Sequence, residues 1–220
     1  MTETKCLYET VGTGTLAPGL TLKQLKDRPR VYVVHDFLSD AECDHIIALG
    51  TGDMEQSITV DMNTGLDAIN SDRTSTSTWL VRGEDPVVAE VERRLAELIN
   101  LPAGHGCNIN LLRYRLGQQY APHDDFFDPD EPGLKETIEE QGQRFLSVLL
   151  YLSDVEEGGE TFFPEAGLEF KPVKRATLLF YNVLPDGSID RFSHHGSAPV
   201  IRGEKWVGTK WIMERDADNR

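Results

Sequence analysis

The sequence predicts a mainly β domain, a barrel or sandwich with helices packed outside it, and three observations support this fold class. Short apolar runs separated by turn residues follow one another after Gly106, which is typical of antiparallel β-structure. The two clearest helical patterns lie before that point, so helices and strands are segregated along the chain rather than alternating. The hydrophobic fraction of 39% and the charged fraction of 27% are those of an ordinary globular protein.

Net charge and apolar run lengths exclude several classes of protein. The 22 basic and 37 acidic residues give a formal charge of −15, which repels phosphate backbones and anionic lipid surfaces, so we expect no nucleic acid and no membrane as partner. No run of 18 apolar residues occurs, which argues against a membrane-spanning helix. The first residues lack a secretory signal pattern, and the three cysteines form no CxxC pair. We therefore expect a cytoplasmic protein.

The chain divides into an N-terminal arm, residues 1–29, and a single domain, residues 30–216. The arm is rich in Gly, Thr and Lys and shows no sustained periodicity, so we expect an irregular lead-in. A β-branched run over residues 30–34 then predicts the first strand. Ser39 and Glu42 match a capping box, which predicts that a helix begins there.

Residues 50–78 are polar and contain a Ser/Thr-rich run, so we expect a loop or weak strands that could act as a lid. A second helix follows, with Asp85 as its cap and Pro86 in its first turn. Its apolar residues recur at helical spacing: Val87, Val88, Val91, Leu95, Leu98 and Ile99. Pro102 and Gly104 are expected to end it.

The second half of the domain reads as a series of short strands. We expect the helices mainly within 39–100 and the β core mainly within 106–214. The run from Phe145 to Leu152 is apolar throughout, as in a strand that is buried on both faces. The predicted strands are 107–114, 144–152, 168–171, 176–183, a piece near 193–200, and 205–213.

A candidate metal site lies among these strands. In an extended segment, residues i and i+2 point the same way, so His123 and Asp125 can reach one point while Asp124 faces the other side. A second histidine pair, His194 and His195, follows in the next group of strands. Two imidazoles and one carboxylate are the facial ligand set of non-haem iron(II), which leaves coordination positions open. A structural zinc site would instead close all four positions, mostly with Cys and His.

Lys205 begins an apolar strand, and Val207 and Thr209 share its side. A lysine that enters a barrel interior needs an anion, because an unpaired buried charge is costly. The alternative is an ammonium group that stays in water at the end of the strand. An iron(II) site with a carboxylate-bearing co-substrate accounts for both the lysine and the open metal positions.

Three segments resemble the prolyl 4-hydroxylase family and occur in the order that the family has. The likeness extends from about residue 30 to 214. The first two are 114–125, YRLGQQYAPHDD, and 144–164, RFLSVLLYLSDVEEGGETFFP. The third joins HGSAPV at 195–200 to GEKW at 203–206. Members of this family are iron(II)- and 2-oxoglutarate-dependent dioxygenases with a double-stranded β-helix (jelly-roll) core. The resemblance therefore implies such a core here, packed against the N-terminal helices.

The resemblance also implies roles for particular residues. His123, Asp125 and His195 would bind iron, with His195 preferred to His194 because of its position in the motif. Lys205 would bind the distal carboxylate of 2-oxoglutarate, and Tyr114 and Thr161 would donate hydrogen bonds to the same molecule. Further matches to the family suggest substrate contacts, which are Arg144, Trp211, Arg73 and Ser75.

The implied activity is similar to that of a procollagen-proline 4-dioxygenase: hydroxylation of prolyl residues of a peptide or protein, with the 4-position expected, and release of succinate and carbon dioxide. Dioxygen is consumed, and ascorbate (vitamin C) is the expected reductant that keeps iron in the iron(II) state. Two alternatives stay open: a hydroxylase of a free amino acid or other small molecule, and a jelly-roll binding module without turnover. The oligomeric state, monomer or homodimer, also stays open.

Overall fold

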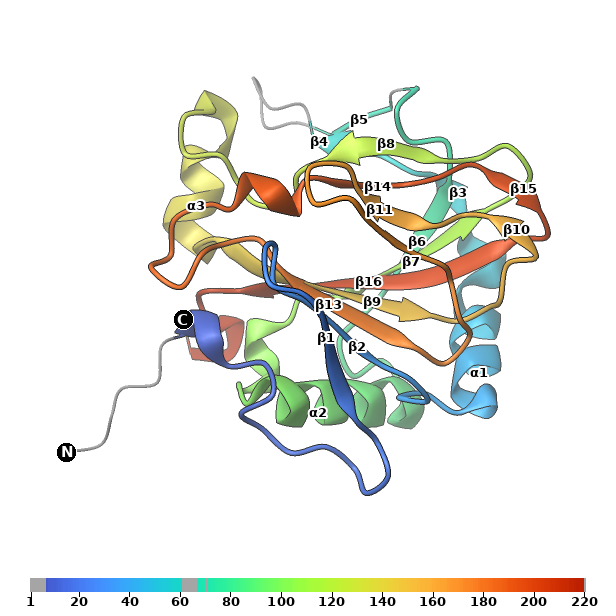
Figure 1. The fold of residues 1–220 in the computed structure, drawn as a ribbon, viewed down its shortest axis with the longest axis horizontal. Coiled ribbons are helices and arrows are strands. Elements are labelled where there is room, and N and C mark those ends of the chain that lie inside the picture. The colour runs from blue at the N-terminus through green and yellow to red at the C-terminus, as the bar shows by residue number, and fades with distance from the viewer. Residues whose placement is uncertain (1–6, 61–66, 70, 220) are drawn as a thin grey trace.

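Two antiparallel sheets face each other in the computed structural model, which describes residues 7–60, 67–69 and 71–219 (Figure 1). The larger sheet has eight strands, in the order β1 (Leu22–Lys26), β2 (Val31–Val34), β13 (Thr177–Tyr181), β9 (Arg144–Tyr151), β16 (Lys205–Met213), β7 (Ile109–Tyr114), β6 (Thr76–Leu80) and β3 (Glu55–Gln56). The smaller sheet has four, in the order β12 (Leu168–Phe170), β11 (Thr161–Phe163), β14 (His195–Ser197) and β8 (Tyr120–His123). This arrangement is the predicted double-stranded β-helix.

Short elements complete the fold. Two further pairs of strands are antiparallel: β10 (Glu157–Gly158) with β15 (Val200–Arg202), and β4 (Thr59–Val60) with β5 (Asp67–Ala68). Short 3-10 helices occupy Leu7–Glu9, Thr51–Asp53, Ala103–His105, Pro132–Leu134, Arg191–Ser193 and Ala217–Asn219. Within the described residues, no helix has the length and apolar character needed to cross a membrane.

Helix α1 (Asp40–Gly50) begins where the capping box predicted. The Ser39 side chain accepts a hydrogen bond from the Glu42 backbone N–H, and the Glu42 carboxylate accepts one from Ser39 N at 2.7 Å. These two bonds satisfy donors that the first helical turn leaves without partners. The local sequence therefore determines this helix start.

Helix α2 (Pro86–Ile99) begins as predicted but ends earlier than expected. The Asp85 carboxylate accepts hydrogen bonds from the backbone N–H groups of Val87 and Val88. The helix stops at Asn100, whose φ of 55° is left-handed, before Pro102 is reached. Asparagine tolerates this conformation better than most residues, so it can end a helix without glycine or proline.

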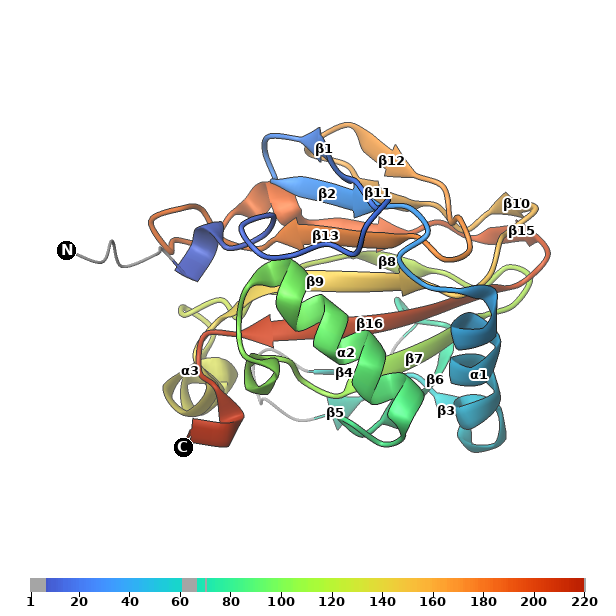
Figure 2. The same cartoon turned by 90° about the horizontal axis from the view of Figure 1, so that it is seen from below.

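The larger sheet separates two hydrophobic cores. On one face, α1 and α2 pack against the sheet (Figure 2), and Val91 and Leu95 of α2 belong to the same cluster as Leu111 and Ile212. On the other face, Tyr151 and Val207 share a second cluster with Phe163 of the smaller sheet. Alternate residues of β7, β9 and β16 thus point either to the helices or to the space between the sheets.

The irregular structure expected over residues 1–29 is wrong for part of that range. Residues 1–6 lie outside the described residues, but β1 pairs with β2 along the edge of the larger sheet. Leu16, Leu20 and Leu22 pack against the core that the helices share with the larger sheet. The edge of β2 offers unpaired backbone groups, and pairing with them overrides the weak local pattern. The boundary at residue 30 stays a prediction.

The polar segment 50–78 forms short strands β3, β4 and β5, in agreement with the prediction of a loop or weak strands, apart from 61–66 and 70, which lie outside the described residues. The six strands predicted in the second half correspond to β7, β9, β12, β13, β14 and β16. Sequence patterns missed helix α3 (Lys135–Gln141) and the two- and three-residue strands β10, β11 and β15. Elements this short carry too few residues for a periodic signal.

Candidate metal centre and the pockets beside it

Three predicted ligands meet between the sheets. His123 ends β8, Asp125 follows it, and His195 opens β14 in register with His123. Each of the three offers one ligand atom, and these atoms all lie within 4.8 Å of one another. The Nε2 atoms of His123 and His195 are 3.6 and 3.8 Å from the two oxygens of Asp125. Strand pairing therefore brings together residues about seventy positions apart.

The surrounding groups orient these ligands for a metal. Nδ1 of His123 contacts the carbonyl of Ala121 at 3.0 Å, and Nδ1 of His195 contacts the carbonyl of Ser193 at 2.9 Å. A carbonyl accepts a hydrogen bond, so Nδ1 carries the proton and Nε2 keeps its lone pair for a metal. The Ser147 hydroxyl donates to Asp125 at 2.6 Å. The donor set and its supports fit iron(II).

The charges of the cluster also suit metal binding. Burial lowers the pKa of His195 to about 4, and the neighbouring His123 adds to the effect, so this imidazole is neutral near pH 7. Burial works to raise the pKa of Asp125, but the two histidines and the Ser147 hydrogen bond hold it well below its usual range. A neutral imidazole and an ionised carboxylate are the forms that bind metal.

The second histidine of the pair points elsewhere. Nδ1 of His194 lies 3.0 Å from the Asp124 carboxylate, and neither residue belongs to the metal-binding cluster. Asp124 therefore faces away from the ligand position, as the alternation along the strand predicted. The geometry favours His195 over His194 as the ligand.

Lys205 lies in a small inner pocket next to the cluster. Its side chain is 2% exposed, and Nζ donates a hydrogen bond to the Ser197 hydroxyl at 2.8 Å. Among the described residues, no carboxylate forms an ion pair with it. Burial lowers its pKa to about 7, and the charge of Glu160 only partly opposes this. A buried amine with a hydroxyl partner and no carboxylate is suited to bind the carboxylate of a ligand.

Two predicted hydroxyl groups line the same inner pocket. Tyr114 is buried, and the Lys205 ammonium lies 5.3 Å from its ring centroid. Burial raises the pKa of Tyr114, so its hydroxyl is a donor at neutral pH. Thr161 Oγ1 accepts a hydrogen bond from the Tyr151 hydroxyl at 2.8 Å, which leaves the threonine proton for a ligand. Both residues line the inner pocket together with Lys205, so their role towards a co-substrate stays a prediction.

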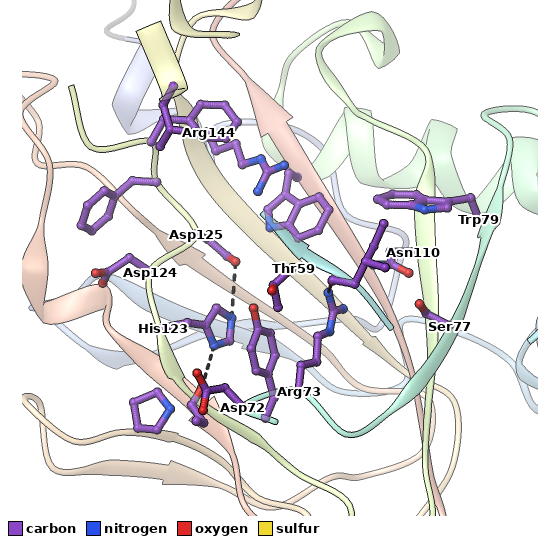
Figure 3. A pocket seen from close by; sticks show the side chains of 18 residues that line it. Thr59, Asp72, Arg73, Ser77, Trp79, Asn110, His123, Asp124, Asp125 and Arg144 are labelled. Carbon is purple, nitrogen blue, oxygen red and sulfur yellow. Dashed lines mark hydrogen bonds and ion pairs between the residues drawn. The ribbon is translucent and has the colours of Figure 1, made fainter. Parts of the chain in front are cut away.

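A larger outer pocket of about 330 Å³ adjoins the cluster and opens to the surface. Figure 3 shows His123 and Asp125 on one side of it and Arg73 and Asn110 across from them. The Arg144 guanidinium lies 4.1 Å from the Trp211 ring centroid and 4.5 Å from that of Phe127. These two ring contacts fix the position of the Arg144 guanidinium. Burial lowers the pKa of Arg144.

Of the four predicted substrate contacts, three line the outer pocket and one does not. Arg73, Arg144 and Trp211 belong to its wall, and Arg73 stacks over the Tyr120 ring at 4.8 Å. Ser75 is fully buried, and its hydroxyl donates to Ser57 at 2.9 Å. Ser75 therefore lies behind the wall, where it supports neighbouring residues and has no open path to a substrate.

The sequence-based prediction missed several residues that support the site. The Tyr120 ring stacks on His123 with centroids 3.6 Å apart, and Asn182 donates to the Ser147 hydroxyl at 2.9 Å. Ser197 holds Lys205, as described above. A signal existed for Ser197 only, because it lies two residues after His195 and so shares its side of β14. Ser147 and Asn182 lie in apolar runs that give no hint of their partners.

Comparison with known proteins agrees with this geometry. The family model of the 2OG-Fe(II) oxygenase superfamily matches residues 109–213, which include all three clustered ligands and Lys205. The fold and the site therefore define an iron(II)- and 2-oxoglutarate-dependent oxygenase. Two relatives from Arabidopsis thaliana define the class more narrowly. "Probable prolyl 4-hydroxylase 8" is 40% identical, and the match covers 87% of this chain and 71% of the relative. "Prolyl 4-hydroxylase 5" is 42% identical, and the match covers 84% of this chain and 68% of the relative. The chain belongs to the prolyl 4-hydroxylase family.

Solved structures show the same likeness. A viral collagen prolyl hydroxylase from Paramecium Bursaria Chlorella virus-1, in complex with 2OG, superposes with a TM-score of 0.65 at 27% identity and covers 83% of this chain and 95% of the other. A Pseudomonas putida prolyl-4-hydroxylase shares the fold at a TM-score of 0.57 and 17% identity, covering 84% and 92%.

Proposed function

We propose that this protein hydroxylates prolyl residues of a peptide or protein, at the 4-position, with iron(II), 2-oxoglutarate and dioxygen, and that it releases succinate and carbon dioxide. The observation that carries the proposal is the His123–Asp125–His195 cluster beside Lys205, a buried amine without a carboxylate partner among the described residues. A closed structural metal site would need neither an open coordination face nor a buried cation next to it.

Each group in the site has a part in this reaction. His123, Asp125 and His195 would hold iron(II) on one face, and Lys205 would bind the distal carboxylate of 2-oxoglutarate. Tyr114 and Thr161 would donate hydrogen bonds to the same co-substrate from the wall of the inner pocket. When bound, the metal and co-substrate supply the oxidation chemistry that side chains lack. The chain positions the reactants and keeps bulk water from the buried inner pocket.

The outer pocket favours a peptide over a free amino acid. It opens beside the metal cluster, and its wall includes the indoles of Trp79 and Trp211 and the guanidinium of Arg144. A proline-rich chain is already ordered as a polyproline helix, so it can dock on aromatic rings at low entropic cost. The names of the relatives, a collagen prolyl hydroxylase among them, point to the same kind of substrate for those proteins.

A direct assay tests the proposal. Purified protein is incubated with iron(II), 2-oxoglutarate and ascorbate, and mass spectrometry then measures a gain of one oxygen on proline-containing peptides and on free proline. We expect the product on peptides. Product on free proline alone would instead establish the small-molecule hydroxylase. An absence of 2-oxoglutarate decarboxylation with every candidate, despite iron binding, would establish the binding module.

The adjacent histidines provide a matched pair of variants for the metal site. His195→Ala removes a ligand, so we expect loss of both iron binding and activity while the fold is retained. His194→Ala removes only the contact to Asp124, so we expect iron binding to persist. Iron content by metal analysis, with circular dichroism as a folding control, measures both. Iron retained by His195→Ala and lost from His194→Ala would contradict the assignment.

Three further parts of the proposal depend on other measurements. Ascorbate is proposed as the reductant that maintains iron(II), and its omission should shorten the period of activity. A cytoplasmic location is proposed from the charge and the cysteine pattern. Sedimentation would distinguish a monomer from a homodimer, and the proposed reaction needs only the residues of one chain.

A further inference from the structure

Asn110 lies in the wall of the outer pocket, and its buried amide has no hydrogen-bond partner within residues 7–60, 67–69 and 71–219. Its side chain is 2% exposed, and Oδ1 is fully buried and accepts no hydrogen bond. Among the described residues, no group bonds to the amide nitrogen of Asn110 either. A buried amide that lacks its hydrogen bonds costs folding free energy. Asn110 lines the outer pocket, and a rotation of its side chain turns the buried Oδ1 towards that pocket, where a ligand can supply the missing partners.

The surroundings of Asn110 indicate what kind of ligand this is. Asn110 lies on β7, between Trp79 of the neighbouring strand β6 and Thr209 of the neighbouring strand β16. Each of these two residues is paired with Asn110, so the three side chains share one face of the sheet. The Trp79 and Trp211 rings are 6.0 Å apart between centroids. Figure 3 shows Trp79, Asn110 and Ser77 on neighbouring strands at the same side of the pocket. Trp79 is 46% exposed, which is unusual for so large an aromatic side chain.

Other unpartnered groups share this wall. The indole Nε1 of Trp211 and the guanidinium Nε atoms of Arg73 and Arg144 are buried donors without an acceptor in the described structure. Oδ1 of Asn110 is the acceptor among these orphaned atoms of the wall. A ligand that pairs with these atoms, once the side chains turn them towards the pocket, presents carbonyl oxygens to the donors and an N–H group to Oδ1. A peptide backbone with a single N–H next to a proline has this composition, whereas polyproline has carbonyls alone.

We infer that Asn110 hydrogen-bonds the peptide unit of a residue adjacent to the target proline, and that the substrates are therefore isolated prolines beside a residue with a backbone N–H rather than uninterrupted polyproline. This inference rests on the proposed prolyl hydroxylase function. The Oδ1 atom accepts from the backbone N–H, and the amide nitrogen donates to a carbonyl. A proline, or another residue without a backbone N–H, at this position next to the target proline leaves Oδ1 of Asn110 desolvated and unpaired. The pocket therefore discriminates against substrates with such a residue there.

The test uses three synthetic peptides that differ by one methyl group. The parent contains Ala-Pro-Ala, and each analogue carries N-methylalanine on one side of the target proline. We expect one of the two analogues to lose roughly tenfold or more in affinity and in kcat/KM with the wild-type protein, as the loss of one buried hydrogen bond and the desolvation of its acceptor predicts. Fluorescence anisotropy of labelled peptides measures affinity without turnover, and succinate release measures activity.

Asn110→Leu should abolish this discrimination. With this variant, the affinity and kcat/KM of the parent peptide should fall to those of the poorer analogue, while the values of that analogue should stay as they are with the wild type. Asn108→Leu is the matched control, because Asn108 is exposed and already accepts a hydrogen bond from the Arg82 backbone N–H at 3.0 Å. It should discriminate as the wild type does. Asn110→Ala serves as a second variant if the larger leucine does not fold.

Thermal unfolding separates a binding role from a structural one. Asn110→Leu removes an amide that has no hydrogen-bond partner among the residues the structure describes, so we expect its melting temperature to be equal to or above that of the wild type. An amide that held the fold together would give a lower one. Equal use of all three peptides by the wild type, or discrimination that persists in Asn110→Leu, overturns the inference. If no peptide is hydroxylated while 2-oxoglutarate is consumed with another substrate, the proposed prolyl hydroxylase function is wrong, and the inference about Asn110 falls with it.

Discussion

Lys205 and Lys210 lie on the same strand, β16, and both are almost fully buried, at 2% and 3% exposure. They are five residues apart, so they point to opposite faces of the sheet. Lys210 faces helix α2, where its Nζ lies 2.6 Å from the Glu92 carboxylate. Lys205 faces the space between the sheets, where the Ser197 hydroxyl is its hydrogen-bond partner. One buried cation thus has its carboxylate in the chain, while the other has room for one from outside.

The difference between these lysines shows how a structural charge is told from a functional one. Both have a lowered pKa because of burial, but Glu92 opposes the shift at Lys210 through charge and a hydrogen bond. Glu92 also accepts a hydrogen bond from the Gly83 backbone N–H at 2.8 Å, so the pair is well satisfied. Burial alone does not distinguish the two residues. The presence of the counterion within the chain does.

The largest expected effect comes from breaking the satisfied pair. Lys210→Met leaves the Glu92 carboxylate buried and unpaired, and removal of one partner of a buried pair costs about 3–5 kcal/mol of unfolding free energy. Chemical denaturation measures this change. The KM for 2-oxoglutarate of the protein that remains folded should not change, because Lys210 faces away from the inner pocket.

The double variant Lys210→Met with Glu92→Leu is the control for this interpretation. It removes both charges, and well-packed apolar pairs often replace buried ion pairs at little cost in stability. Recovery of most of the lost stability is expected. A double variant as unstable as Lys210→Met alone would mean that packing of the lysine chain, rather than charge, carries the effect.

Lys205→Met should have the opposite profile, with a smaller effect in free energy. A charge-assisted contact contributes about 1.5–3 kcal/mol, so the KM for 2-oxoglutarate should rise by roughly 10- to 150-fold. The unfolding free energy should stay equal or increase, because the variant removes a buried amine that has no carboxylate partner in the described part of the chain. Steady-state kinetics and denaturation on the same preparation give both values. An unchanged KM would contradict binding of the co-substrate by Lys205.

The smallest expected effect is a pH dependence that belongs to Lys205. Its pKa of about 7 in the free protein means that the ammonium is present below pH 7 and is lost as the pH rises through that value. The Kd for 2-oxoglutarate should therefore increase above pH 7, by up to about tenfold per pH unit. The nearby hydroxyls of Tyr114 and Tyr151 do not titrate there, because burial raises their pKa values. Calorimetry should give a flat profile for Lys205→Met.

Local patterns were sufficient to predict the two longer helices, α1 and α2, and to suggest His123 and Asp125 as metal ligands, but they missed α3. Ser39 with Glu42 and Asp85 with Pro86 marked both helix starts, because caps and first-turn residues act within a few positions. The spacing of His123 and Asp125 placed both on one side of an extended segment. The family resemblance, rather than spacing, distinguished His195 from His194, and the fold then explained the choice through the register of β14 with β8.

Partners distant in the chain could not be predicted in the same way. Only the family resemblance set Lys205 apart from Lys210, which lies on the same apolar strand, and Ser147, Asn182 and Asn110 lie in segments without a distinguishing pattern. Whether each of these residues contacts a carboxylate of the chain or lines a ligand pocket depends on the order of the strands and on the face of the sheet that the residue occupies.

The amino-acid sequence alone therefore determined the helix caps, the alternation of the strands and the metal-ligand types, since these depend on neighbours within one or two turns of chain. The sheet pairing determined the rest: the common position that the three ligands face and, within the described part of the chain, the lack of a carboxylate beside Lys205 and of a hydrogen-bond partner for Asn110. These features arise from burial and from contacts between distant segments, and a linear pattern does not encode either of them.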